Sequence, residues 1–116
     1  MRIISQNGLL DMPYELIAIS PYSGNMSTIV GTFPGNDLGK GDRVYILAEY
    51  STEEKAIKAM EMCRKRYTQY IFNRRMVTVV ANDLTRIPLE EAEKVRDQIS
   101  ETFIFQFPKE EEVEDE

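Results

Sequence analysis

A group of basic side chains in the middle of the sequence could bind an anionic ligand. Residues 55–86 hold eight basic and two acidic groups, in a chain whose overall charge is −6. The basic residues are interleaved with aromatic rings and an amide: Arg64, Lys65, Arg66, Tyr67, Tyr70, Phe72, Asn73, Arg74, Arg75 and Arg86. Guanidinium groups bind phosphate through paired hydrogen bonds and stack on flat rings. The combination therefore suits a ligand that carries phosphates and a base.

A structural role explains part of the same cluster. Basic groups at 64–66 complement the negative end of a helix that we expect to finish near Tyr70. Arg74 and Arg75 fit this interpretation poorly, because they crowd like charges between that helix and the next element. Both interpretations remain open. Extended nucleic acid fits less well, since residues 87–116 hold eleven acidic and three basic groups and would repel a polyanion.

The residue types that most enzymes depend on are scarce. The chain has no histidine and one cysteine, Cys63, which excludes histidine-based triads, Cys-His dyads and zinc sites that use histidine. Cys63 falls in an apolar helical stripe, where a thiol packs in the core and is unreactive. The stretch Gly35 to Gly41 (GNDLGKG) is one residue short of a P-loop and precedes a strand. We predict a non-enzyme with no catalytic residue, metal or cofactor.

Cysteine usage and hydropathy predict a compartment. A lone cysteine cannot form an internal disulfide, which is typical of a reducing cytoplasm. Residues 1–20 show no basic leader followed by an apolar stretch, and no apolar run is long enough to cross a membrane. We therefore expect a cytoplasmic protein that does not contact a membrane.

The first half of the chain reads as strands joined by turns. Asn7-Gly8 is a strong turn signal, and Asp11-Met12-Pro13 reads as a break in the chain. β-Branched and aromatic residues are concentrated between such turns. The predicted strands are 3–6, 14–20, 27–33 and 43–50, which together form an antiparallel meander.

A long helix follows, from Ser51 to Tyr70. Ser51 and Glu54 have the spacing of a capping box, and apolar residues then recur at helical intervals. Ala59 and Met62 begin a second apolar edge on this helix. That edge predicts self-association of the 51–70 helix into a homo-oligomer.

The remaining elements complete an α+β fold. They are a strand at 76–81 ending at Asn82 and Asp83, a short second helix beginning at Pro88, and a closing strand through Phe103, Phe105 and Phe107. We predict one domain at 1–109, with an antiparallel β-meander packed on the long central helix. Residues 110–116 should form a disordered acidic tail whose removal leaves the fold intact.

Three stretches carry a resemblance. The opening MRIISQNG…DMPYE, the block ILAEYSTEEKAIKAMEMCR and the ending FIFQFPKEEEVEDE resemble small proteins from phages and prophages of Gram-positive bacteria. The predicted order of elements is also similar to that of the first type of anti-Thoeris proteins. Members of that family sequester the cyclic ADP-ribose signal of a bacterial immune system without cleaving it, and they assemble through their helices.

The anti-Thoeris resemblance implies roles for residues of the basic segment. Phe72 would stack on the adenine, and Asn82 and Asp83 would bond its edge or a ribose. Three arginines would hold the pyrophosphate: Arg64, Arg74 and Arg75. Asn73 would also contact the ligand. The alternative is an inhibitor of a host defence protein that binds its target through the acidic tail or a sheet edge.

Overall fold

The computed structural model describes residues 1–33, 44–82 and 103–113 and has the predicted α+β class. Six strands and one long helix, α1 (Glu53–Asn82), form its regular elements. The strands are β1 (Arg2–Ile4), β2 (Asp11–Pro13), β3 (Ala18–Tyr22), β4 (Asn25–Thr32), β5 (Tyr45–Glu49) and β6 (Ile104–Gln106). Two 3₁₀ turns, η1 (Tyr14–Leu16) and η3 (Glu110–Glu112), complete the list of described elements.

The strands form two sheets of three. The first sheet has the order β2-β1-β6, and the second has the order β3-β4-β5. The predicted meander is confirmed for the second sheet, where all neighbours are antiparallel. It is wrong for the first strand, because β1 pairs antiparallel with β2 and parallel with β6, almost the full length of the chain away.

The segment between β1 and β3 also differs from the prediction. Asp11–Pro13 forms the edge strand β2 rather than a break, which Pro13 permits because it stands at the end of an edge strand. Tyr14–Leu16 turns as η1, so the predicted strand 14–20 begins only at Ala18. The turn η1 brings Tyr14 towards the helix, where its ring lies 4.3 Å from that of Tyr67.

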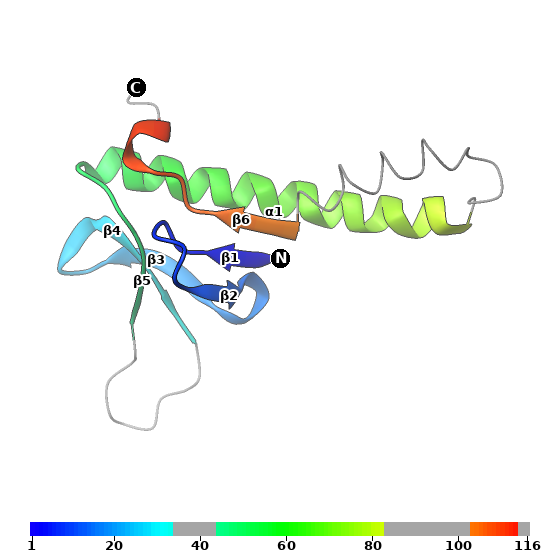
Figure 1. Cartoon of the computed structure of the whole chain (residues 1–116), viewed down its shortest axis with the longest axis horizontal. Coiled ribbons are helices and arrows are strands. Elements are labelled where there is room, and N and C mark those ends of the chain that lie inside the picture. The colour runs from blue at the N-terminus through cyan, green and yellow to red at the C-terminus, as the bar shows by residue number, and fades with distance from the viewer. Residues whose placement is uncertain (34–43, 83–102, 114–116) are drawn as a thin grey trace.

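Helix α1 lies along both sheets over its first half and extends beyond them over its second (Figure 1). Its inner face joins strands of both sheets in one core, whose fully buried side chains include Ile3, Ile29, Leu47 and Phe107. Ala59 lies in this core and is 0% exposed. Of the two residues of the apolar edge predicted for self-association, Ala59 is therefore used within the fold, and only Met62 is exposed.

Helix α1 is longer than the sequence predicts. It continues through Tyr70 and through the expected strand 76–81 to end at Asn82. The run from 53 to 82 contains no glycine or proline, and the strand preference of valine and threonine is too weak to end a helix by itself. None of the described helices is apolar over a length that could cross a membrane. The second helix predicted from Pro88 lies outside the described residues.

The N-terminal end of α1 is capped differently from the prediction. The backbone N–H of Lys55 donates to Thr52 Oγ1 at 3.2 Å, so Thr52 is the cap residue. The predicted capping box of Ser51 and Glu54 is therefore wrong. Ser51 instead donates from its backbone N–H, at 3.0 Å, and from its hydroxyl to the carboxylate of Glu110.

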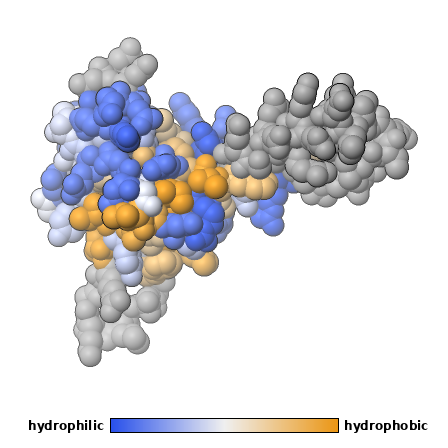
Figure 2. Space-filling view, viewed as in Figure 1, coloured by the Kyte–Doolittle hydropathy of each residue, from blue (hydrophilic) through white to orange (hydrophobic). Residues whose placement is uncertain are grey.

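Residues 107–113, which we call the C-terminal strap, follow β6 and cross the beginning of α1 (Figure 1). Its Pro108 carbonyl accepts hydrogen bonds from Tyr50 Oη at 2.7 Å and Gln6 Nε2 at 3.1 Å. Phe107 and Val113 are buried. The corner of the surface formed by the strap and the start of α1 is hydrophilic (Figure 2). The predicted disordered tail is thus wrong for 110–113, and 114–116 lie outside the described residues.

Glu110 connects the strap to α1 through an ion pair with Lys55. Its carboxylate accepts from Lys55 Nζ at 3.0 Å as well as from Ser51. Hydrogen bonds from Ser51, and then from Lys55, hold the pKa of Glu110 below its usual value. The contacts of Glu110 with α1 could not be predicted from the run of consecutive acidic residues, because a run of like charges is normally solvated.

Ending the chain after Lys109 should destabilise the protein. The truncation removes the buried side chain of Val113, whose burial contributes about 1.5–3 kcal/mol to the free energy of unfolding, and also removes the Glu110 contacts. A chain that ends after Val113 is the matched control and should keep its stability. Urea unfolding followed by circular dichroism measures both. Equal midpoints for the two truncated chains would contradict the structural role of the strap.

Candidate functional site

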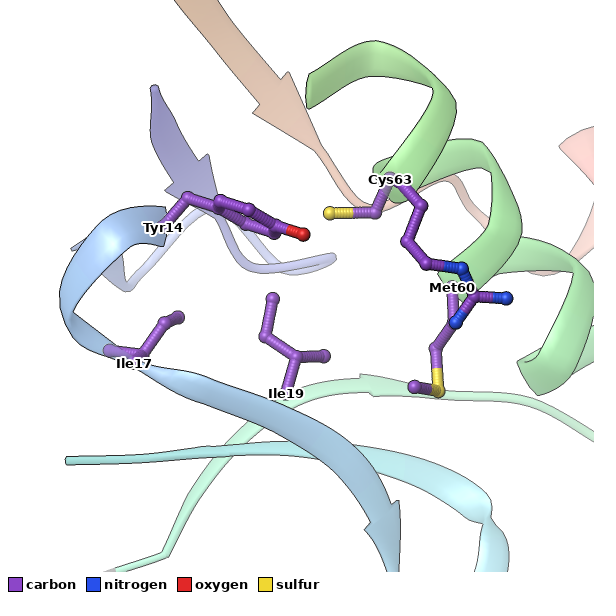
Figure 3. Close-up of a pocket in the computed structure, with 6 residues that line it drawn as sticks. Tyr14, Ile17, Ile19, Met60 and Cys63 are labelled. Carbon is purple, nitrogen blue, oxygen red and sulfur yellow. The ribbon is translucent and has the colours of Figure 1, made fainter. Parts of the chain in front are cut away.

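A cavity of about 200 Å³ lies between α1 and the chain that forms η1 and β3 (Figure 3). Its lining consists of Tyr14, Ile17, Ile19, Met60, Cys63 and Arg64. The three helical residues have the spacing i, i+3 and i+4, which places them on one face of α1. The two isoleucines alternate along an extended segment and therefore point to one side of it. Figure 3 shows Tyr14 and the isoleucines facing Met60 and Cys63 across the cavity.

In the part of this lining that the structure describes, Arg64 is the only charged residue. Among the described residues, its guanidinium makes no hydrogen bond and no ion pair. Other cations do have partners. Arg2 Nε lies 2.8 Å from Asp11 Oδ1, and Lys55 pairs with Glu110. A guanidinium beside an apolar cavity can therefore accept the anionic group of a ligand.

The two other polar groups of the lining are neutral. Burial raises the pKa of the Cys63 thiol to about 12, and the residue is 2% exposed. The prediction that Cys63 packs in the core is confirmed. Burial, followed by the neighbouring Cys63, also raises the pKa of Tyr14. At neutral pH both groups keep their protons, so the cavity offers one fixed positive charge and otherwise uncharged walls.

The structure brings only one of the predicted ligand-binding residues to this cavity. Arg64 lines it, whereas Phe72, Asn73, Arg74 and Arg75 follow on the extended second half of α1. At 3.6 residues per turn, Phe72 and Arg74 point about 200° apart around the helix axis. They cannot hold one small ligand from the same copy of the chain.

Of the two remaining predicted residues, Asn82 is the one that the structure describes. Asn82 is the last residue of the helix, so its predicted position at the end of a strand is wrong. Asp83 lies outside the described residues. Phe72 is 62% exposed and Arg75 is exposed, so both could contact a partner molecule.

Some of the basic cluster has a structural role, as the alternative interpretation expected. Arg66 Nη1 donates to the carbonyl oxygen of Ile104 at 3.3 Å, and its guanidinium carbon lies 6.0 Å from the centre of the Phe105 ring. The tyrosines of the cluster pack within the fold. The ring of Tyr67 lies 5.8 Å from that of Tyr70, which meets the ring of Phe103 edge-on at 5.4 Å.

Sequence reasoning missed the apolar half of the cavity. The predicted strand 14–20 contains Tyr14, Ile17 and Ile19, and nothing local indicates that η1 turns this segment against α1. The helical spacing of Met60 indicates a place in the apolar stripe of the helix and not a ligand site. The one available signal was Pro13, since the residues after a proline often begin a turn.

Two other hollows are less suited to an anion. One, of about 260 Å³, lies between the strap and α1, and its lining includes the cations Arg66 and Lys109 together with the acid Glu112. Arg66 already donates to the Ile104 carbonyl, and the Gln6 amide already bonds Pro108 and Glu49. The other, of about 380 Å³, lies on the outer face of the second sheet and has Glu49 as its charged residue.

The part of the chain that the structure describes contains no group of three or more histidine, cysteine, aspartate or glutamate side chains placed to hold a metal ion. The lining of the α1–β3 cavity combines an apolar interior with one guanidinium. This composition fits the binding of an anion with an apolar portion. In comparisons with known proteins, the chain matches no family model, no curated protein and no solved structure.

Proposed function

We propose that this protein binds a small anionic ligand in the cavity between β3 and α1 and does not convert it chemically. The observation that carries the proposal is the guanidinium of Arg64, which lines an apolar cavity and has no partner among the described residues. Binding sites for small molecules commonly combine apolar walls with a few polar groups that fix orientation. Here the walls would retain an apolar portion of the ligand, and Arg64 would hold its anionic group.

The protonation states of the lining support binding rather than catalysis. General acids and bases work best when their pKa lies near the working pH. Cys63 and Tyr14 both have raised pKa values. The lining therefore provides recognition but no group poised to transfer a proton at neutral pH.

The narrower proposal is that the ligand is a signalling nucleotide of the cyclic ADP-ribose type. The protein would then be a phage-encoded anti-defence protein that sequesters the signal in the cytoplasm of the infected bacterium. The sequence resemblance supports this, and Arg64 is one of the arginines it implicates. Phe72 and Arg75 are exposed and lie three residues apart on one face of α1, so this face of a second copy could contribute to the site. The narrower proposal therefore includes a homo-oligomer.

The test is the removal of the Arg64 charge. Replacing Arg64 with glutamine should weaken nucleotide binding about tenfold to hundredfold, because a hydrogen bond to a charged group contributes about 1.5–3 kcal/mol. Titration calorimetry with cyclic ADP-ribose isomers and a panel of linear nucleotides provides the measurement. Lys65→Gln is the matched control, since this exposed neighbour carries the same charge but does not line the cavity.

Two results would oppose the proposal. If no nucleotide releases or absorbs heat with folded protein, the nucleotide-binding function is wrong. In that case the alternative function, inhibition of a host protein through a sheet edge or the acidic residues, is the next to test. If Arg64→Gln and Lys65→Gln bind a nucleotide equally well, the ligand does not depend on this cavity.

A further inference from the structure

The size and lining of the α1–β3 cavity also restrict which part of a ligand can enter, an inference that rests on the proposed binding function. We propose that the cavity accepts one flat ring and that the anionic group of the same ligand stays at Arg64. The class of ligand would be anions that carry one flat aromatic ring system, single or fused, of which a nucleoside monophosphate with its base is an example. A larger nucleotide would insert its base and leave the rest outside.

Volume sets the first restriction. At about 200 Å³, the cavity lies below the range of about 300–1,000 Å³ that is common for pockets holding whole drug-sized ligands. It can take a ring but cannot enclose a ring together with a sugar and phosphates. The remaining parts of a nucleotide would therefore lie along the surface beside the cavity.

The chemistry of the walls sets the second restriction. Ile17, Ile19 and Met60 are apolar, and a thioether makes favourable contacts with aromatic rings. The Cys63 thiol is neutral and cannot balance a charge. A phosphate among these side chains would lose its hydration without a counter-charge, which is strongly unfavourable. The anion is therefore expected at Arg64 and the ring against the apolar walls.

Contacts within the fold hold one wall in place. The ring of Tyr14 packs on that of Tyr67, with centres 4.3 Å apart and planes inclined by 33°. Across the cavity, Cys63 belongs to the buried core. A ring that enters would meet walls already ordered by packing, so less conformational freedom is lost on binding.

Methyl NMR of the full chain, with ¹³C-labelled isoleucine and methionine methyl groups, can test the inference. Adenosine monophosphate is the probe, and ribose 5-phosphate is the matched anion without a base. The base should shift the methyl signals of Ile17, Ile19 and Met60 through its ring current. Ile46 and Met62, which are exposed and do not line this cavity, are the internal controls and should keep their positions.

The two probes should also differ in affinity. Adenosine monophosphate should bind about tenfold more tightly than ribose 5-phosphate, because stacking of a base on an aromatic side chain contributes in that range. Equal affinities would overturn the inference, and so would shifts at Ile46 or Met62 with none at Met60. If calorimetry still shows nucleotide binding that Arg64→Gln weakens, the proposed binding function stands and only the inference about the ring in the cavity is wrong. If no nucleotide gives heat or methyl shifts, the proposed function and this inference are both wrong.

Discussion

Replacing Ala59 with lysine should strongly destabilise the protein. Ala59 is 0% exposed and lies on the face of α1 that packs onto the sheets, in the same core as Ile29 and Leu47. An ammonium group placed there would be buried without an opposite charge, and an uncompensated buried charge costs about 3–5 kcal/mol. Single domains are commonly stable by only about 5–15 kcal/mol. The longer side chain would add overpacking to this loss.

Far-UV circular dichroism and a thermal scan measure the effect of Ala59→Lys. The matched control is Met62→Lys, three residues later on the same helix, where the side chain is 39% exposed. That variant should fold and unfold like the natural sequence. If Ala59→Lys were as stable as Met62→Lys, Ala59 would face solvent. The sequence-based prediction of a second apolar edge for a partner helix would then be right, and the position of α1 on the sheets would be wrong.

The burial of Ala59 in the structure illustrates what a helical sequence pattern can and cannot predict. Apolar residues at helical spacing identified the helix and most of its buried face. The pattern could not say how wide that face is, because the width depends on how many strands the helix covers. Here α1 lies along two sheets, and Ala59, one of the two residues of the edge predicted for another helix, is packed within the chain, whereas Met62 stays exposed.

Local turn signals predicted the second sheet better than the first. The strands β3, β4 and β5 follow one another, and their antiparallel pairing needs only short-range information. The first sheet depends on the pairing of Ile3 with Phe105, which no local signal reveals. The strap was missed for the same reason, since Glu110 finds Ser51 and Lys55 only after the chain ends meet.

In the candidate site, too, some residues could be predicted from the sequence and others could not. Arg64 could be selected from its side-chain chemistry. Grouping Phe72 with Arg74 assumed a loop between a helix and a strand, in which neighbouring side chains can converge on one ligand. Because α1 is continuous through this segment, the two side chains diverge. Tyr14, in turn, could not be linked to Arg64 without knowing that η1 packs against the helix.

Replacing Phe107 with alanine should cause the second large loss of stability. Phe107 is 1% exposed, and its ring meets that of Phe105 edge-on at 5.2 Å. Its backbone N–H donates to the Ile4 carbonyl at 3.0 Å and continues the pairing of β6 with β1. Loss of a buried phenylalanine ring lowers the free energy of unfolding by about 3–5 kcal/mol. For a domain of this size, the melting temperature should fall by about 12–20 °C.

Phe72→Ala is the matched control, because it removes the same atoms from a ring that is 62% exposed on α1. Its melting temperature should change little, since an exposed ring buries little apolar surface on folding. Similar melting temperatures for the two variants would mean that Phe107 is not part of the core and that the strap does not join the chain ends.

The folded Phe72→Ala protein can also be used to measure nucleotide affinity. This measurement separates two candidate positions of the base, the cavity beside Arg64 and the extended half of α1. Unchanged affinity would exclude Phe72 as a contact of the base, as the cavity proposal expects. A tenfold or larger loss without a change in stability would place the base on the extended half of α1.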